Sequence, residues 1–182
     1  MRSLVLAVFL LASLHLHAAA SVRLYGEELA RFLQNDGTDN TRIVVTTPSD
    51  FGAGSLRAAI EAVNDDPLCG TATKCTIVFA GPMTIAPSIP LPPIRKCNVE
   101  IVGGSGIEPP NEPKPIVISG ENATWGNGLE VRASCAAGVG GVTIQSLVVH
   151  WWPWNGIYFE APAPHAGFAS HGIYASYIGL DP

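Results

Sequence analysis

Three tryptophans stand within four residues of one another and are the most unusual feature of the chain: Trp151, Trp152 and Trp154. An indole ring presents a broad, apolar and electron-rich face, which suits the C–H groups of a sugar ring. On the edge of a turn, these rings would form a stacking platform for glycans. The alternative is that one or two of them pack inside a wide corner and that Pro153 sets the turn.

Carboxylates are the other candidates for chemistry, because cleavage of a glycosidic bond needs two of them, or one and a base, in one groove. Glu130 and Glu160 are expected to lie near each other with Arg132 beside Glu130, which favours a solvated face with an ion pair. No metal site, cofactor or Ser/His/Asp triad is predicted, because the histidines are spread out. From residue 75 onward the acids are equally dispersed: Glu100, Glu108, Glu112, Glu121, Glu130, Glu160 and Asp181.

The first 20 residues have the parts of a secretory signal peptide. Arg2 supplies the positive charge, residues 4–14 form an apolar run, and residues 18–20 are three alanines. The run is about half of the ~20 apolar residues that a membrane span needs, so cleavage after Ala20 is expected rather than anchoring. We therefore predict a secreted or cell-surface protein with a signal peptide at 1–20 and a leader segment at 21–42.

If the protein is exported, its four cysteines are expected to form disulfides, because an even number in an oxidising compartment suggests such bonds. Cys69 and Cys75 bracket a short polar loop and are expected to close it, which leaves Cys97 to pair with Cys135. The alternatives are a metal site or free buried thiols. The sequence contains no C-x-x-C pair, and no histidine stands at zinc-finger spacing, so a metal site is the weakest of these.

Asn122 begins the triplet Asn-Ala-Thr, which is an acceptor sequence for N-linked glycosylation. It would be modified only in a host that glycosylates exported proteins. The alternative is an unmodified surface turn.

Composition favours short strands over helices. The chain has 182 residues, of which 19 are Gly and 15 are Pro, residues that helix interiors disfavour. The 47% hydrophobic share is too high for a disordered chain. With a formal charge of −5, nothing in the sequence predicts nucleic-acid binding through phosphate contacts.

One helix is predicted, over residues 55–64, with Ser55 as its N-cap and Pro67 just beyond its end. Its apolar face comprises Leu56, Ala59, Ile60 and Val63. Gly, Pro or Asn usually lies between neighbouring predicted strands. These strands are residues 43–47, 76–80, 83–86, 99–102, 116–119, 129–132, 142–149, 157–160 and 173–178.

The strands repeat along the chain. The pattern that starts at Val99 recurs at Ile116 and Val142, 17 and 26 residues apart. A second pattern, Gly-Leu or Gly-Ile, starts at Gly128, Gly156 and Gly172. Repeats of roughly this length are typical of solenoids, in which stacked turns bury ladders of apolar side chains. The predicted helix would cover the open N-terminal end of such a coil.

Residues 49–60, S-D-F-G-A-G-S-L-R-A-A-I, resemble the N-terminal signature of secreted right-handed parallel β-helix proteins, the C-S-L-R-E-A-I type. The T-I-V-F stretch at 76–79 and the I-G-L-D stretch at 178–181 continue the resemblance. Gly54 and Ala58 depart from it, standing where the signature has Cys and Glu. Because coils in that family continue past the I-G-x-D step, the resemblance implies that the chain is a fragment.

We therefore expect an all-β, right-handed parallel β-helix over residues 43–182, with an N-terminal capping helix. The favoured function is non-enzymatic: a strand face that binds glycans or a surface or matrix partner. The first alternative, implied by the resemblance, is a polysaccharide lyase or glycoside hydrolase whose catalytic coils lie beyond residue 182. The second is a structural stalk.

Overall fold

The structure, a computed structural model, describes residues 41–104, 116–136, 139–160, 171–174 and 176–179. All of these belong to one unit, which begins at Thr41. The predicted signal peptide and most of the leader lie outside the described residues, as do Glu108, Glu112, His165 and Asp181.

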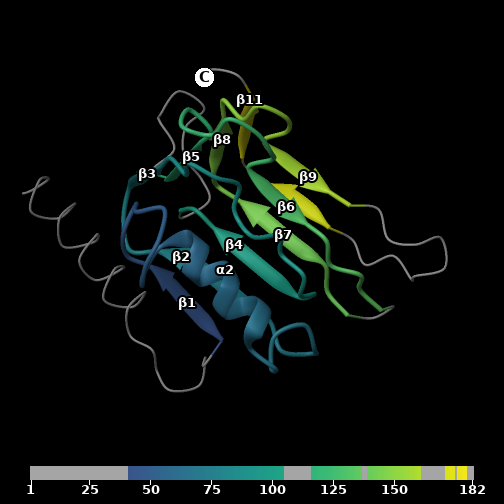
Figure 1. The fold of residues 1–182 in the computed structure, drawn as a ribbon. Helices are drawn as coiled ribbons and strands as arrows, with labels where there is room; N and C mark the ends of the chain where they lie inside the picture. The colour runs from purple at the N-terminus through teal and green to yellow at the C-terminus, as the bar shows by residue number, and fades with distance from the viewer. Residues whose placement is uncertain (1–40, 105–115, 137–138, 161–170, 175, 180–182) are drawn as a thin grey trace, which may run out of the picture. The chain divides into compact units, whose positions relative to one another are not determined.

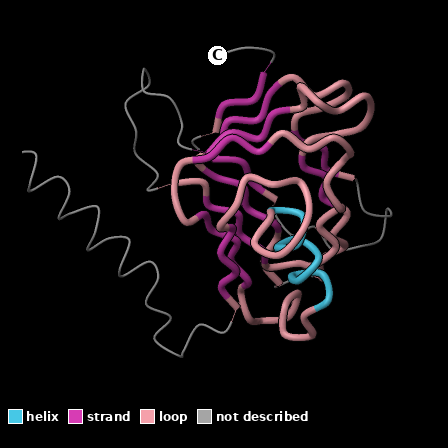
Figure 2. Tube along the Cα trace, turned by 60° about the vertical axis from the view of Figure 1, so that its left-hand side comes forward, coloured by secondary structure: helices cyan, strands magenta, loops and turns pink. Residues whose placement is uncertain are grey.

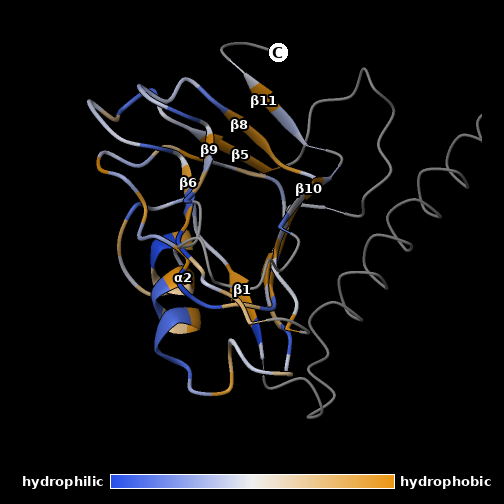
Figure 3. Ribbon diagram, turned by 90° about the vertical axis from the view of Figure 1, so that its right-hand side faces the viewer, coloured by the Kyte–Doolittle hydropathy of each residue, from blue (hydrophilic) through white to orange (hydrophobic). Residues whose placement is uncertain are grey.

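Short parallel strands stack into three sheets around a common interior (Figure 1 and Figure 3). Sheet A consists of β1 (Arg42–Val45), β2 (Cys75–Phe79), β4 (Val99–Val102), β7 (Val142–Gln145) and β10 (Gly172–Tyr174). Sheet B consists of β3 (Met83–Ile85), β5 (Ile116–Ser119), β8 (Val148–His150) and β11 (Tyr177–Gly179). Sheet C pairs β6 (Leu129–Val131) with β9 (Ile157–Phe159). The chain visits the sheets in this order, so it forms a parallel β-solenoid of about 4 turns, which confirms the predicted fold class.

Alternate residues of each strand fill the interior, because successive side chains of a strand point to opposite faces. In sheet A, Ile101 lies between Ile77 and Ile144 of the neighbouring turns, and all three are fully buried. Leu129 and Ile157 are matched in the same way in sheet C. At ~25 cal/mol per Å² of apolar area removed from water, these ladders are the main stabilising contribution.

The predicted helix is α2 (Leu56–Asp65), which packs against β1 and β2 near the N-terminal end of the solenoid (Figure 2). Ser55 caps it by accepting a backbone N–H of its first turn. Asn64 fastens its far end, because its amide donates to the Pro93 carbonyl and accepts from the Arg95 N–H, both at 2.9 Å. The predicted apolar face is buried: Leu56, Ala59, Ile60 and Val63.

Arg57 lies beside this apolar face and is itself buried, although it is charged. It forms an ion pair of 2.6 Å with Asp50 and donates to the backbone carbonyls of Ile89 and Pro90. The other Asp50 oxygen accepts the N–H and the hydroxyl of Ser88, both at 2.8 Å. The arginine of the sequence signature therefore joins the helix, the loop before it and the first turn of the solenoid.

The predicted period of the repeat is partly wrong. Val99 and Ile116 begin strands of different sheets within one turn, and Val99 lies opposite Val142 instead. The spacing from Gly128 to Gly156 does mark one turn, since the strands that follow these glycines pair in register. Sheets A and B bury every second residue alike, so the local pattern does not tell which sheet a strand joins.

Two of the predicted strands contain a corner of the solenoid. Residues 142–149 divide into β7 and β8, and residues 173–178 fall on β10 and β11. Ser146 has a φ of 56°, in the left-handed region, and this turns the chain from sheet A to sheet B. Gly103 lies against this corner, because a Cβ there would overlap the carbonyl oxygen of Ser146.

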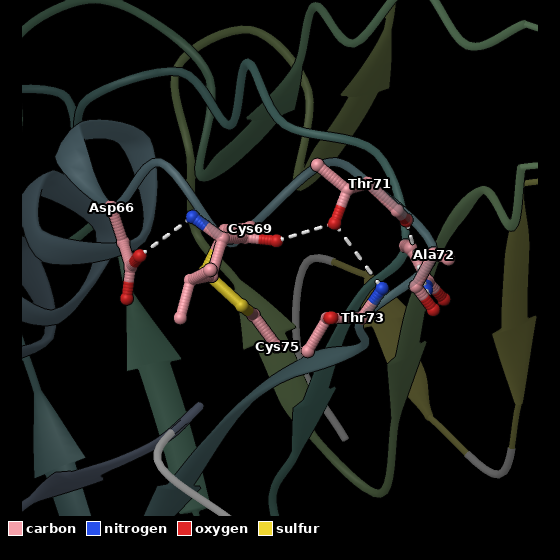
Figure 4. The surroundings of a disulfide bond; sticks show 8 residues. Asp66, Cys69, Thr71, Ala72, Thr73 and Cys75 are labelled. Carbon is pink, nitrogen blue, oxygen red and sulfur yellow. Dashed lines mark hydrogen bonds between the residues drawn. A yellow bond between two sulfur atoms is a disulfide. The ribbon is translucent and has the colours of Figure 1, made fainter.

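Two disulfides link Cys69 to Cys75 and Cys97 to Cys135, the pairing expected from the sequence. The first closes the loop between α2 and β2, in which the Thr71 hydroxyl makes two local hydrogen bonds (Figure 4). The second joins the corner before β4 to the corner before β7, so it links successive turns. All four cysteines are in disulfides, which overturns the metal-site and free-thiol alternatives.

Candidate functional site

The three tryptophans of the predicted platform lie in different environments. Trp152 is only 6% exposed, and its Nε1–H donates to the Ile118 carbonyl at 3.4 Å. This ring fills the inside of the corner, which is the alternative that the sequence left open for one or two of the three tryptophans. Trp151 is exposed, but its ring lies against that of His150, with centroids 4.4 Å apart. Trp154 is 63% exposed, more than any other large hydrophobic residue of the described chain.

Trp154 has a partner that the sequence analysis missed, Trp125 of the preceding turn. The two rings meet edge to face, with centroids 6.2 Å apart, and Trp125 is 53% exposed. The Trp154 N–H also donates to the Gly126 carbonyl at 3.3 Å. Each tryptophan shortly precedes the glycine that opens a strand of sheet C, Gly128 or Gly156. The glycine repeat therefore held a signal that would have placed these rings together.

Close stacking of the two corners positions this tryptophan pair. A Cβ at Gly128 would lie 2.7 Å from Nε1 of Trp152, so a glycine is needed where the buried ring passes beneath. The side-chain amide of Asn155 donates to Oδ1 of Asn127 at 2.9 Å, which joins the corners a second time. Asn155 is exposed beside Trp154 in the chain, so polar amide groups flank the apolar ring.

A surface depression of about 300 Å³ lies beside Trp154. Its lining comes from the third and fourth turns and is polar and apolar in about equal measure, with Asn155 as its polar side chain. Ile178, on the fourth-turn side, is 42% exposed. The residues that line the depression are Trp152, Trp154, Asn155, Gly156, Ile157, Ile178 and Gly179.

The carboxylates that came together are held by cations. Arg132 Nε lies 2.7 Å from Glu130 and 3.0 Å from Glu160, which matches the expected ion pair on the outer face of sheet C. The hydrogen bond to Glu130, and then its charge, raises the pKa of Arg132 further above its ordinary value. On sheet A, Glu100 pairs with Lys74 at 2.7 Å. One guanidinium binds both Glu130 and Glu160, so the two carboxylates form an ion-pair cluster and not an acid/base pair.

His171 has a defined role in the fourth turn. Its Nδ1 accepts the N–H of Val142 at 3.0 Å, and its ring stacks on Phe159 with centroids 5.4 Å apart. Burial lowers the pKa of this imidazole, which must be neutral at Nδ1 to accept that bond. Within the described part of the chain, no group of three or more His, Cys, Asp or Glu side chains could hold a metal ion.

The predicted glycosylation acceptor, Asn122, is exposed in the corner that carries Trp125. Its side-chain amide donates to the carbonyl of Ala86 in the preceding turn at 3.3 Å. A glycosylated amide keeps one N–H, so this bond is compatible with modification. Whether the site is used stays a prediction.

No protein-family model and no curated protein matches the chain. The sheet topology establishes the parallel solenoid. Because no family model matches, the likeness to the C-S-L-R-E-A-I group remains a resemblance. Among the described residues, no helix is both long and apolar enough to cross a membrane. The two disulfides are of the kind found in proteins from oxidising compartments.

Proposed function

We propose that this protein is an exported glycan-binding β-solenoid, and that its sugar-binding site is centred on Trp125 and Trp154. The observation that carries the proposal is the meeting of two exposed indole rings from successive turns, 6.2 Å apart. Rings that are 53% and 63% exposed leave much apolar area in water, which a sugar stacked on the face of one ring and touching the edge of the other would cover.

The chemistry around the pair supports a sugar ligand. Exposed or half-exposed amide groups such as Asn155 supply hydrogen bonds for hydroxyls beside an apolar ring face. Few charges lie nearby: in the corner segments 86–93, 120–128 and 151–156, Glu121 is the only charged residue. Catalysis finds no such support, since the carboxylates of Glu130 and Glu160, which converge on sheet C, are bridged by Arg132.

Titration calorimetry with neutral oligosaccharides, alongside tryptophan fluorescence, tests this proposal. Trp154→Ala and Trp125→Ala should each weaken binding by about tenfold, the equivalent of one lost ring contact. Trp151→Ala is the matched control, because it removes an exposed indole whose contact is with His150. Equal affinity in all three variants, or loss only in Trp151→Ala, would place the site elsewhere. Absence of binding to every sugar would leave the structural stalk as the better hypothesis.

Export is the second part of the proposal and is supported by the disulfides and the N-terminal signal features. In an expression host with a secretory pathway, the protein should appear in the medium with Ser21 as its first residue. N-terminal sequencing of the exported product checks this. Retention of residues 1–20 on a membrane-bound product would contradict it.

A further inference from the structure

The tryptophan pair belongs to a longer line of exposed apolar side chains. Four such residues are Phe51 in the loop before α2, and Ile89, Trp125 and Trp154 in the corners that follow sheet B in the first, second and third turns. Their exposed fractions are 57%, 42%, 53% and 63%. We call these four residues the corner row.

Arg57 sets the first two members of the corner row close together. Its guanidinium carbon lies over the Phe51 ring, 4.7 Å from the centroid. The same guanidinium donates to the carbonyl of Ile89 at 3.0 Å. Asp50, which precedes Phe51 in the chain, binds Ser88, which precedes Ile89. The loop before α2 and the corner after β3 are therefore held together by these contacts.

Close backbone contacts carry the corner row onward to the third turn. Gly126 lies directly on Pro90, because a Cβ on Gly126 would overlap the proline ring. Trp125 and Ile89, their respective neighbours in the chain, thus lie in adjacent turns. Beyond Trp154 the depression beside it reaches Ile178 of the fourth turn. The corner row therefore passes from the loop before α2 through the first three turns, and the depression extends this line to the fourth.

We propose that the corner row binds an uncharged, extended, β-1,4-linked polysaccharide chain that lies along the solenoid axis, with about one sugar unit for each turn. This proposal rests on the proposed function and adds to it the class, the direction and the length of the ligand. Stacked strands are ~4.8 Å apart, close to the length that one pyranose adds to an extended β-1,4-linked chain. Successive sugars would then meet successive members of the row.

Charge and shape select this ligand over other polymers. The charged side chains at the corner row, Asp50 and Arg57, neutralise each other and are largely buried. An acidic polysaccharide would find no free cation among the residues of segments 86–93, 120–128 and 151–156 and would face Glu121. A coiled α-1,4-linked chain cannot follow a straight line of contacts. If the corner row instead bound a protein, the affinity for oligosaccharides would not rise with their length.

Calorimetry with the purified protein tests the direction of the ligand by its length. Affinity should rise steeply from cellobiose to cellohexaose, and should be low for maltohexaose and for oligogalacturonate. Phe51→Ala should weaken cellohexaose binding about tenfold and leave cellobiose, which the tryptophan pair alone can hold, nearly unchanged. Phe51→Tyr should restore the affinity for cellohexaose. Leu68→Ala, which removes an exposed side chain outside the row, is the control for general effects.

The outcomes separate this inference from the proposed function. If Trp154→Ala weakens both sugars while Phe51→Ala changes neither, the site binds glycans but the chain does not run along the axis. The same conclusion follows if maltohexaose binds as well as cellohexaose. If none of the sugars binds, the proposed function fails and the corner row has another role. Circular dichroism of each variant, unchanged from the wild type, shows that the fold is kept.

Discussion

At the scale of single residues, one ion pair does much of the positioning. Arg57 and Asp50 have side chains only 9% and 14% exposed, and together they contact the cap loop and the first corner. Burial alone would raise the pKa of Asp50, but hydrogen bonds from Arg57 and Ser88 outweigh it and the pKa lies below its ordinary value. The carboxylate therefore stabilises the fold at neutral pH, and this contribution is lost as the pH falls through and below the ordinary aspartate range.

Asp50→Asn should destabilise the protein by about 3 kcal/mol, because it leaves the Arg57 charge buried without its partner. Lys74→Ala breaks an ion pair whose lysine is 58% exposed, and should cost less than about 1 kcal/mol. Urea unfolding at neutral pH measures both. Similar losses for the two variants would contradict the importance given to the Asp50–Arg57 pair.

A second residue-scale effect concerns His171. Its pKa is lowered on folding, so the folded protein binds fewer protons than the unfolded chain and stability falls as the pH drops below about 6.5, the ordinary histidine value. Protonation of Nδ1 also removes the acceptor of the Val142 N–H. The melting temperature should therefore decrease between pH 7 and pH 5, and more steeply in the wild type than in His171→Gln. Parallel pH profiles for the two proteins would show that this histidine is not responsible.

At the scale of elements, the corners determine the position of the tryptophan pair more than the strands do. The strands of sheet C are only three residues long, and the rings of the proposed site stand on the corners before them. Glycines allow these corners to stack, as at Gly128, where a Cβ would lie against Trp152 and overlap the backbone of Gly156. The position of the tryptophan pair thus depends on residues that have no side chain.

Gly128→Ala should destabilise the protein by roughly 1–3 kcal/mol, the usual cost of overpacking, and should shift the emission of the buried Trp152. Gly81→Ala is the matched control, because a Cβ at Gly81 has no atom within 4 Å. Its effect should stay within about 0.5 kcal/mol. Thermal unfolding followed by fluorescence measures both variants. If Gly128→Ala is tolerated as well as the control, the packing of Gly128 against Trp152 and Gly156 is loose enough to accept a methyl group.

At the scale of the whole molecule, the two disulfides do different work. The bond from Cys97 to Cys135 spans 38 residues and links turns, whereas the bond from Cys69 to Cys75 spans 6 and closes one loop. In the chain-entropy model a longer closed loop restricts the unfolded chain more. The longer link therefore matters more for holding the turns together.

Removal of the longer link by Cys97→Ala with Cys135→Ala should lower the free energy of unfolding by roughly 4 kcal/mol. Removal of the shorter one by Cys69→Ala with Cys75→Ala should lower it by roughly 2 kcal/mol. Denaturant titration of the two double variants, each compared with the wild type, gives the values. A reversed order would mean that the loop beside α2 is the more important constraint.

The fold could be predicted from the sequence because its determinants are local. The apolar face of the helix, its Ser55 cap and the alternation within strands such as 99–102 depend on neighbours a few residues away, and so does the loop closed by Cys69 and Cys75. These features are enough for a capped β-solenoid. The burial of Trp152 was not among them, since a tryptophan in a corner has the same neighbours in the sequence whether it points in or out.

Tertiary structure decided most of the contacts between distant residues, although the sequence did predict that Glu130 meets Glu160 and that Cys97 pairs with Cys135. Strands of sheets A and B carry the same alternation, so only packing of complete turns sets Val99 against Val142 and places Ile116 on another face. The partnership of Trp125 with Trp154, and the alignment of Phe51 and Ile89 with them, follows from that register and from corners of unequal length. Stacking in a solenoid brings together residues one turn apart whatever the length of the loop between them, so a repeat gives that distance only where it recurs in the same sheet, as at Gly128 and Gly156.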